Sequence, residues 1–379
     1  MHVQMIASCP QENYEQAQFL SVAYPLSSTA IKVMELNPSF ILGQSHLFHY
    51  NSANQCLTLS PPFQELLRLL VELKELNPNV LTIESLYELN TILQQPQGET
   101  GGLMRKEGTE RWHLEDNSTK RQHRQELEQL LERLGFVHPL SLDRQMIVNH
   151  CLLFGARTER MEKRIRETLH YLRNTLQVTD HIFLLGSNRA LIPEELVYLK
   201  SKMERLEEAD KSFWNDVFND SKQATEANAF RCLWECLICL EPPEIQMSLR
   251  EKVIGIKSTR IGYSYRDSCG HRATAETTVE DWMSFYKENE PQAIFALAEQ
   301  PYIRLTDQLR FTVLSKGKKA SREELVTRIK NATFYFASPV PDSHPLLSVR
   351  FDEIARHVYH AVNCLKYLES LGEAPLTSN

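Results

Sequence analysis

From residue 146 onward, short apolar runs alternate with longer amphipathic segments. The first two runs, 146–156 and 181–187, enclose a segment with apolar residues at helical spacing, and its length suits a parallel crossover. Three more β-prone runs follow at 252–258, 292–300 and 332–339, again separated by helical patterns. This alternation predicts an α/β fold, doubly wound, with a mainly parallel sheet and helices on both faces.

The N-terminal part of the chain has a different, mostly helical pattern. Residues 61–76 place leucines at helical spacing after two prolines, and residues 85–93 carry a second helical pattern. Residues 95–120 lack periodicity and are rich in glycine and polar residues, which predicts an exposed loop or domain boundary. We therefore divide the chain into a smaller N-terminal region, 1–120, and a Rossmann-like domain with a C-terminal helix, 121–379.

Composition narrows the classes of protein that the chain could belong to. Its net charge of −7 argues against a protein that coats nucleic acid, because phosphate backbones are bound by basic surfaces. No apolar stretch approaches the roughly 20 residues needed to span a bilayer, and the N-terminus lacks a basic segment followed by an apolar one. The eight cysteines are scattered, mostly in apolar segments, which favours a reducing compartment. We expect a cytoplasmic protein without a membrane span or a nucleic-acid partner.

Ligands of an open α/β sheet bind where the strands end, so the residues that follow each predicted strand are the first candidates. Small residues follow the first two strands and would let an anion approach the backbone. At least one arginine follows each of the first four strands, and its planar fork pairs with phosphate or carboxylate. The alternative is that each arginine is a solvated loop residue. The predicted ligand-binding residues are Gly155, Ala156, Arg157, Gly186, Ser187, Asn188, Arg189, Arg272, Thr274, Gln300, Tyr302 and Arg304.

Five short motifs follow one another along the chain: FGAR (154–157), HIFLLGSNRAL (181–191), TEA (225–227), HRATAETT (271–278) and ALAEQPYIR (296–304). Their order resembles the YdcF-like family, which includes SanA and ElyC. The resemblance covers about residues 146–340 and implies a Rossmann-like domain that binds a nucleotide or an S-adenosylmethionine-type ligand. The chain departs from the family pattern at Gly186-Ser187, where two glycines are usual, and in lacking the Asn common in the Thr-containing motif. The resemblance implies a site lined by Gly155, Gly186, Glu226, Thr274, Tyr302 and Arg304.

Glu226 is the candidate for a catalytic role. A carboxylate at the ligand edge can act as a general base, which would suit a transferase or a hydrolase. A Glu in the first turn of a helix is more often a cap or a partner of the helix dipole, and this structural role is the alternative. The sequence thus leaves open whether the protein is an enzyme.

Two groups of residues match part of the spacing of a metal site. Cys232, Cys236 and Cys239 match the C-x3-C-x2-C spacing of an iron-sulfur site, but they lie late in an apolar helical stretch, so we expect core residues. Cys269 and His271 lack two further zinc ligands at familiar spacing. We therefore predict no metal site and name no cofactor.

Two functions remain as hypotheses. In the first, the protein binds an anionic nucleotide-like or phosphorylated small molecule at the strand ends, with or without catalysis. In the second, it is a non-enzymatic interaction module that keeps the fold and holds a protein partner through the N-terminal region. A survey for small molecules that remain bound after purification would distinguish the two.

Overall fold

The structure is a computed structural model, and it describes ten ranges of the chain. Three predicted ligand residues, Arg272, Gln300 and Tyr302, lie outside these ranges. The ranges are 24–25, 47–51, 56–98, 101–106, 109, 113–138, 144–259, 274–298, 304–338 and 345–373.

A five-stranded sheet forms the centre of the fold, with the strand order β6-β5-β4-β7-β8. Every neighbouring pair is parallel, which confirms the predicted doubly wound α/β architecture. β5 begins at Leu176 rather than near His181, because Leu176 and Val178 face the core while Gln177 and Thr179 face solvent. The strands are β4 (Met146–Phe154), β5 (Leu176–Ser187), β6 (Val253–Ser258), β7 (Gln292–Leu297) and β8 (Ala332–Ala337).

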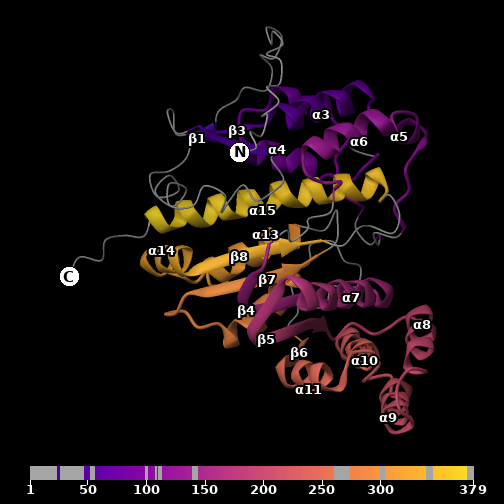
Figure 1. The fold of residues 1–379 in the computed structure, drawn as a ribbon. Coiled ribbons are helices and arrows are strands. Elements are labelled where there is room, and N and C mark those ends of the chain that lie inside the picture. Colours follow the sequence, from indigo (N-terminus) through magenta and orange to yellow (C-terminus); the bar gives the residue numbers. More distant parts are fainter. Residues whose placement is uncertain are drawn as a thin grey trace, which may run out of the picture.

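Helices cover both faces of this sheet, as Figure 1 shows. Successive residues of β4 point to opposite faces, and they join different cores. Leu153 packs in the core that includes α7 (Thr158–Asn174) and α10 (Glu226–Ile238). Its neighbour Leu152 packs with the core residues of α12 (Ala275–Trp282). The chain therefore winds first along one face and then along the other.

Three further helices were not predicted, because they bury little apolar surface. α9 (Glu208–Asn219) buries only Trp214 and Phe218. α11 (Pro243–Lys252) buries a single leucine, and α14 (Arg322–Asn331) buries an arginine beside two apolar residues. A helix with so narrow an apolar stripe lacks the repeated pattern from which amphipathic helices are recognised.

The N-terminal region is the predicted smaller, mostly helical part, and it also contains a three-stranded antiparallel sheet of order β1-β3-β2. Its helices lie against α15 (Leu347–Glu373), which runs between them and the central sheet (Figure 1). Like the other helices in the described ranges, α15 lacks an apolar stretch long enough to cross a membrane. The elements of this region are β1 (Tyr24–Pro25), β2 (Phe48–Asn51), β3 (Cys56–Leu59), α3 (Pro61–Glu72), η2 (Pro78–Thr82), α4 (Leu86–Leu93) and the start of α5 (Ser118–Gln122). The next helix, α6 (Arg124–Arg133), lies beyond residue 120 and packs against α3.

Several described residues of the segment 95–120 are buried, in contrast to the exposed loop that its composition predicted, and the alternative, a domain boundary, stays a prediction. Leu103 is 1% exposed and Arg105 is 3% exposed. The backbone N–H of Arg105 donates to Asp352 Oδ1 of α15 over 3.0 Å, and the two side chains form an ion pair. Polar residues are abundant in this segment because several of them satisfy buried partners on α15.

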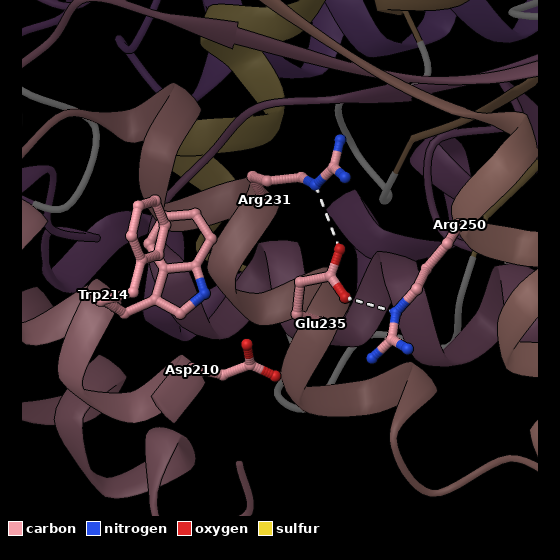
Figure 2. Close-up of a pocket in the computed structure, with 6 residues that line it drawn as sticks. Asp210, Trp214, Arg231, Glu235 and Arg250 are labelled. Atoms are coloured by element: carbon pink, nitrogen blue, oxygen red, sulfur yellow. Dashed lines mark hydrogen bonds and ion pairs between the residues drawn. The ribbon is translucent and has the colours of Figure 1, made fainter. Parts of the chain in front are cut away.

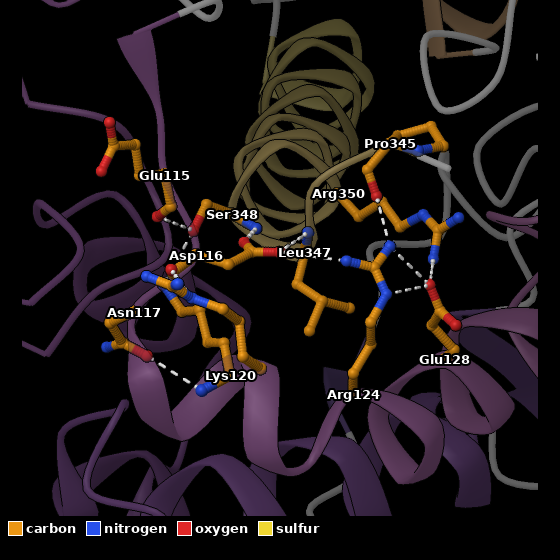
Figure 3. Close-up of polar contacts among 11 residues, drawn as sticks. Glu115, Asp116, Asn117, Lys120, Arg124, Glu128, Pro345, Leu347, Ser348 and Arg350 are labelled. Carbon is orange, nitrogen blue, oxygen red and sulfur yellow. Dashed lines mark hydrogen bonds and ion pairs between the residues drawn. The ribbon is translucent and has the colours of Figure 1, made fainter. Parts of the chain in front are cut away.

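Asp116 provides the clearest example of such a contact (Figure 3). Its carboxylate accepts hydrogen bonds from the backbone N–H groups of Leu347 and Ser348, over 3.0 and 2.8 Å. A carboxylate at this position satisfies N–H groups that the helix cannot pair and interacts favourably with the helix dipole. Lys120 donates to the Ser348 hydroxyl from the same side, over 3.0 Å. The N-terminal region thus supplies the cap of the C-terminal helix.

Candidate functional site

The carboxyl ends of the five parallel strands lie at one edge of the sheet. β4 pairs with β5 on one side and with β7 on the other, so the order of the chain reverses direction between β4 and β7. Such a switch point is where an open α/β sheet binds its ligands. At this edge β4 ends at Phe154, and the backbone N–H of Gly155 donates to the carbonyl of Leu185 over 2.7 Å.

The side chain of Glu226 packs against the backbone of Gly155. A Cβ at residue 155 would be 2.0 Å from Glu226 Oε1 and 2.9 Å from the Leu185 carbonyl oxygen. Only glycine leaves room for the carboxylate here. The side chain of Glu226 is 13% exposed, so the carboxylate lies mostly buried at the end of β4.

Gly186 allows an equally close approach between a strand and a helix. A Cβ at residue 186 would be 2.5 Å from the Cα atom of Ala227, in the first turn of α10. The helix therefore begins directly against the end of β5. We expected the small residues at positions 155 and 186 to let an anion approach the backbone. In the structure these glycines make room for the side chain of Glu226 and for the start of α10.

Arg189 connects these elements through all its guanidinium nitrogens. Nε donates to Glu226 Oε2 over 2.9 Å, and the two terminal nitrogens donate to the carboxylate of Glu195 over 2.8 and 2.9 Å. The terminal nitrogens also contact the carbonyls of Ala156 and Ala190 over 3.3 and 3.4 Å. This geometry favours a positioning role for Arg189 over the direct contact with an anionic ligand that we predicted.

Glu195 is a residue of this site that the sequence did not reveal. Its side chain is fully buried, and besides Arg189 its carboxylate accepts from the backbone N–H of Ile192 over 3.2 Å. Burial raises the pKa of Glu195, but Arg189 and the N–H groups of Ile192 and Thr158 outweigh it, so the pKa lies below its usual value. Thr158 is the first residue of α7, so Glu195 occupies a position suited to an anion. The only signal was a Glu in the first turn after Pro193, which usually indicates a surface cap.

Arg164 is a second residue of this edge that pattern analysis missed. Arg164 lies on α7 and is 2% exposed. Its side chain donates hydrogen bonds to the carbonyls of Phe154 and Gly155, the latter over 3.1 Å. An arginine beside the apolar stripe of a helix is usually a solvated residue. Here it binds carbonyl groups where β4 ends and brings a buried positive charge to the switch point.

Three side-chain oxygens near the ends of β5 and β6 have no hydrogen-bond partner within the described ranges: Asn188 Oδ1, Thr225 Oγ1 and Ser258 Oγ. Thr225 is 4% exposed and Ser258 is fully buried. Thr225 is the N-cap residue of α10, yet its hydroxyl does not make the usual capping bond. The backbone N–H of Asn188 donates to the carbonyl of Ser258 over 3.1 Å. Each of these three oxygens keeps the capacity to accept a hydrogen bond.

Two of the remaining predicted residues, Arg157 and Thr274, are N-cap residues of helices. Arg157 is the partly exposed N-cap residue of α7, and Thr274 caps α12 by accepting from Thr277 N over 3.3 Å. Arg304 begins α13 (Arg304–Leu314), but its side chain lies outside the described residues. Ser187 Oγ accepts from the backbone N–H of Arg189 over 3.2 Å. The structure thus brings together Gly155, Ala156, Gly186, Ser187, Asn188, Arg189 and Glu226.

Two of the three cysteines for which we predicted core positions, Cys232 and Cys236 of α10, lie in the core, whereas Cys239, the C-cap residue, does not. Cys232 and Cys236 are fully buried, while Cys239 is half-buried. Burial, followed by the contact with Cys236, raises the pKa of the Cys232 thiol. Among the described residues no group of His, Cys, Asp or Glu side chains is arranged to hold a metal ion.

Comparison of the chain with protein-family models, curated proteins and solved structures found no match. The resemblance to the YdcF-like family therefore stays a prediction from the order of its motifs. Three of those motifs meet in space, because Gly155, Arg189 and Glu226 belong to the first, second and third of them.

Proposed function

We propose that the protein binds a nucleotide-like small molecule at the carboxyl edge of β4, β5 and β6. The observation that carries the proposal is the set of unsatisfied oxygens on Asn188, Thr225 and Ser258, beside the carboxylate of Glu226. Each of these oxygens can accept a hydrogen bond from a ligand. A bound molecule would then supply partners that these oxygens lack among the described residues.

The chemistry of these oxygens favours a ligand that offers hydrogen-bond donors as well as an anionic group. Sugar hydroxyls or the amino group of a base would donate to Asn188 and Glu226. A bare phosphate would instead be repelled by the Glu226 carboxylate. We expect the anionic part of the ligand to contact Arg157; Arg272 and Arg304 are predicted at the same edge from the sequence, but Arg272 and the side chain of Arg304 lie outside the described residues. A nucleotide or an S-adenosylmethionine-type molecule combines both kinds of group.

Glu226 remains the candidate for proton transfer in this proposal. Arg189 holds one oxygen of the carboxylate, Oε2, and the other, Oε1, lies over Gly155. An oriented carboxylate with one oxygen available to a ligand suits a general base. A transferase or hydrolase reaction on the bound molecule would use the residue in this way.

The proposal is tested by calorimetric titration of AMP, ADP, ATP and S-adenosylmethionine into the wild-type protein and two variants. Asn188→Ala and Glu226→Gln should each weaken binding by about 1 to 3 kcal/mol, the range for hydrogen bonds to neutral and charged groups. Asn174→Ala is the matched control, since Asn174 is exposed and bonds only to His170 at the end of α7. Absence of binding by all four compounds, or equal affinity in all variants, would refute the proposal.

A further inference from the structure

A separate pocket of about 470 Å³ opens between α9, α10 and α11. Figure 2 shows the side chains that line it. Its volume falls in the range of small-molecule sites, roughly 300 to 1,000 Å³. The residues that line it are Asp210, Phe213, Trp214, Arg231, Glu235 and Arg250.

Glu235 holds two arginines in the wall of this pocket. Its oxygens accept from Nε of Arg231 over 3.2 Å and from Nε of Arg250 over 3.1 Å. Glu235 is 15% exposed, whereas the arginines are 38% and 45% exposed. Because each guanidinium uses Nε for this contact, its terminal nitrogens are available to a ligand. A guanidinium held in this way is oriented to bind a carboxylate.

Aromatic side chains form another wall. Trp214 is 8% exposed and stacks on Phe218, so its indole ring is fixed by the core. Phe213 packs against the edge of Trp214, with ring centroids 5.1 Å apart, yet it is 58% exposed. An exposed phenylalanine beside a fixed tryptophan offers an apolar surface to a planar ring.

Asp210 completes the charge pattern. It is exposed at the rim, and among the described residues it forms no ion pair. In Figure 2 its carboxylate and the Arg250 guanidinium lie on either side of Glu235. The pocket contains two arginines and two carboxylates, so its formal charge is zero, and of the two carboxylates Glu235 is the one that the arginines contact. A guanidinium and a second carboxylate in the same neutral pocket suit a ligand that carries both charges.

We propose that this pocket binds a free aromatic α-amino acid in its zwitterionic form. The α-carboxylate lies against the terminal nitrogens of Arg250, the ammonium group faces Asp210, and the aromatic ring packs on Phe213 and Trp214. This site is distinct from the strand edge in its residues and in the chemistry of its ligand. The proposal is independent of the nucleotide proposal.

The test is calorimetric or ligand-detected NMR titration with L-phenylalanine, up to about 5 mM, where a weak site would begin to fill. Three analogues each remove one group: 3-phenylpropionate lacks the ammonium, phenethylamine lacks the carboxylate, and L-alanine lacks the ring. Each should bind about tenfold more weakly than L-phenylalanine, the factor that corresponds to about 1.4 kcal/mol. No binding of L-phenylalanine, or equal binding of the four compounds, would overturn the proposal.

Variants then assign each group to its partner. Arg250→Ala should remove the preference for L-phenylalanine over phenethylamine, and Asp210→Asn should remove its preference over 3-phenylpropionate. Arg133→Ala is the control, because Arg133 is an exposed arginine paired with Glu65 on other helices and should leave binding unchanged. A preference that survives both pocket substitutions, in variants that melt like the wild type, would contradict the assignment.

Discussion

Gly186 lies where α10 begins against β5, and it offers a direct test of this packing. A Cβ at this position would be 2.5 Å from the backbone of Ala227, so Gly186→Ala must displace the helix. We expect a loss of stability of about 1 to 3 kcal/mol, the usual cost of overpacking. Gly255→Ala in β6 is the control, since a Cβ there meets nothing within 4 Å. Urea unfolding measures both, and equal stabilities for the two variants would contradict the packing described here.

Arg189 should be important for stability whether or not a ligand is present. Arg189→Ala leaves the fully buried carboxylate of Glu195 without its charged partner, which should cost about 3 to 5 kcal/mol. Arg189→Lys should recover only part of this loss, because an ammonium cannot reproduce the two parallel bonds. Arg133→Ala, at an ion pair whose side chains are 45% and 51% exposed, should change stability by at most about 1 kcal/mol. Similar losses in the alanine variants, measured by chemical denaturation, would argue against a buried clamp.

The sequence predicted the small residues and the arginine of this site, but not what Arg189 contacts. Its carboxylate partners are 6 and 37 residues away along the chain. Glu195 lies in the first turn of a helix, where an acidic residue normally faces water. The helix α8 (Pro193–Met203) packs against both α7 and α10, and the burial of Glu195 depends on this tertiary packing rather than on local pattern.

At the scale of elements, a buried glutamate joins α7 to α8. Burial raises the pKa of Glu162, but hydrogen bonds from Lys202, Tyr198 and Arg166 outweigh it and lower the pKa from 4.5 to about 2. The folded pKa is therefore below the unfolded one. The stabilisation is complete above about pH 4.5 and is lost as the pH falls towards 2.

Glu162→Gln should thus destabilise the protein at pH 7, by up to about 3 kcal/mol. The difference from wild type should shrink as the pH is lowered from 5 to about 3. Urea unfolding across this range tests the expectation. Glu65→Gln, at a side chain that is 51% exposed, serves as the control and should have little effect. A penalty for Glu162→Gln that does not change with pH would contradict the lowered pKa.

The elements that the sequence predicted well are those with strong periodicity. Strands β4 and β6 to β8 were placed to within three residues, because buried parallel strands appear as continuous apolar runs. α9 and α11 were missed because most of their residues face solvent. The polar segment around Asp116 was misread as an exposed loop, since the sequence does not show that its polar groups meet the start of α15.

At the scale of the whole molecule, one core includes residues of both the N-terminal region and the C-terminal helix. Leu66 of α3, Leu89 of α4 and Leu131 of α6 belong to the same core as Phe351 and Val358 of α15. The division of the chain at residue 120 stays a prediction. This shared core suggests that the two parts depend on each other for stability.

A fragment that contains only residues 121–379 should accordingly be unstable. Removing α3 and α4 exposes apolar residues of α15 and deletes the Asp116 cap. We expect a lower melting temperature than that of the full chain, together with binding of a hydrophobic dye at neutral pH. A fragment that melts cooperatively at the temperature of the full chain would show instead that the division marks independent domains.

The central claim is that a ligand binds where β4, β5 and β6 end. Hydrogen–deuterium exchange, with and without saturating amounts of whichever nucleotide or S-adenosylmethionine binds most tightly, tests its position directly. We expect slower exchange in residues 186–190 and 225–228, which contain Asn188, Thr225 and Glu226, and unchanged exchange in residues 176–180 at the opposite edge of the sheet. Protection confined to other parts of the molecule, with no change in residues 186–190 and 225–228, would contradict it.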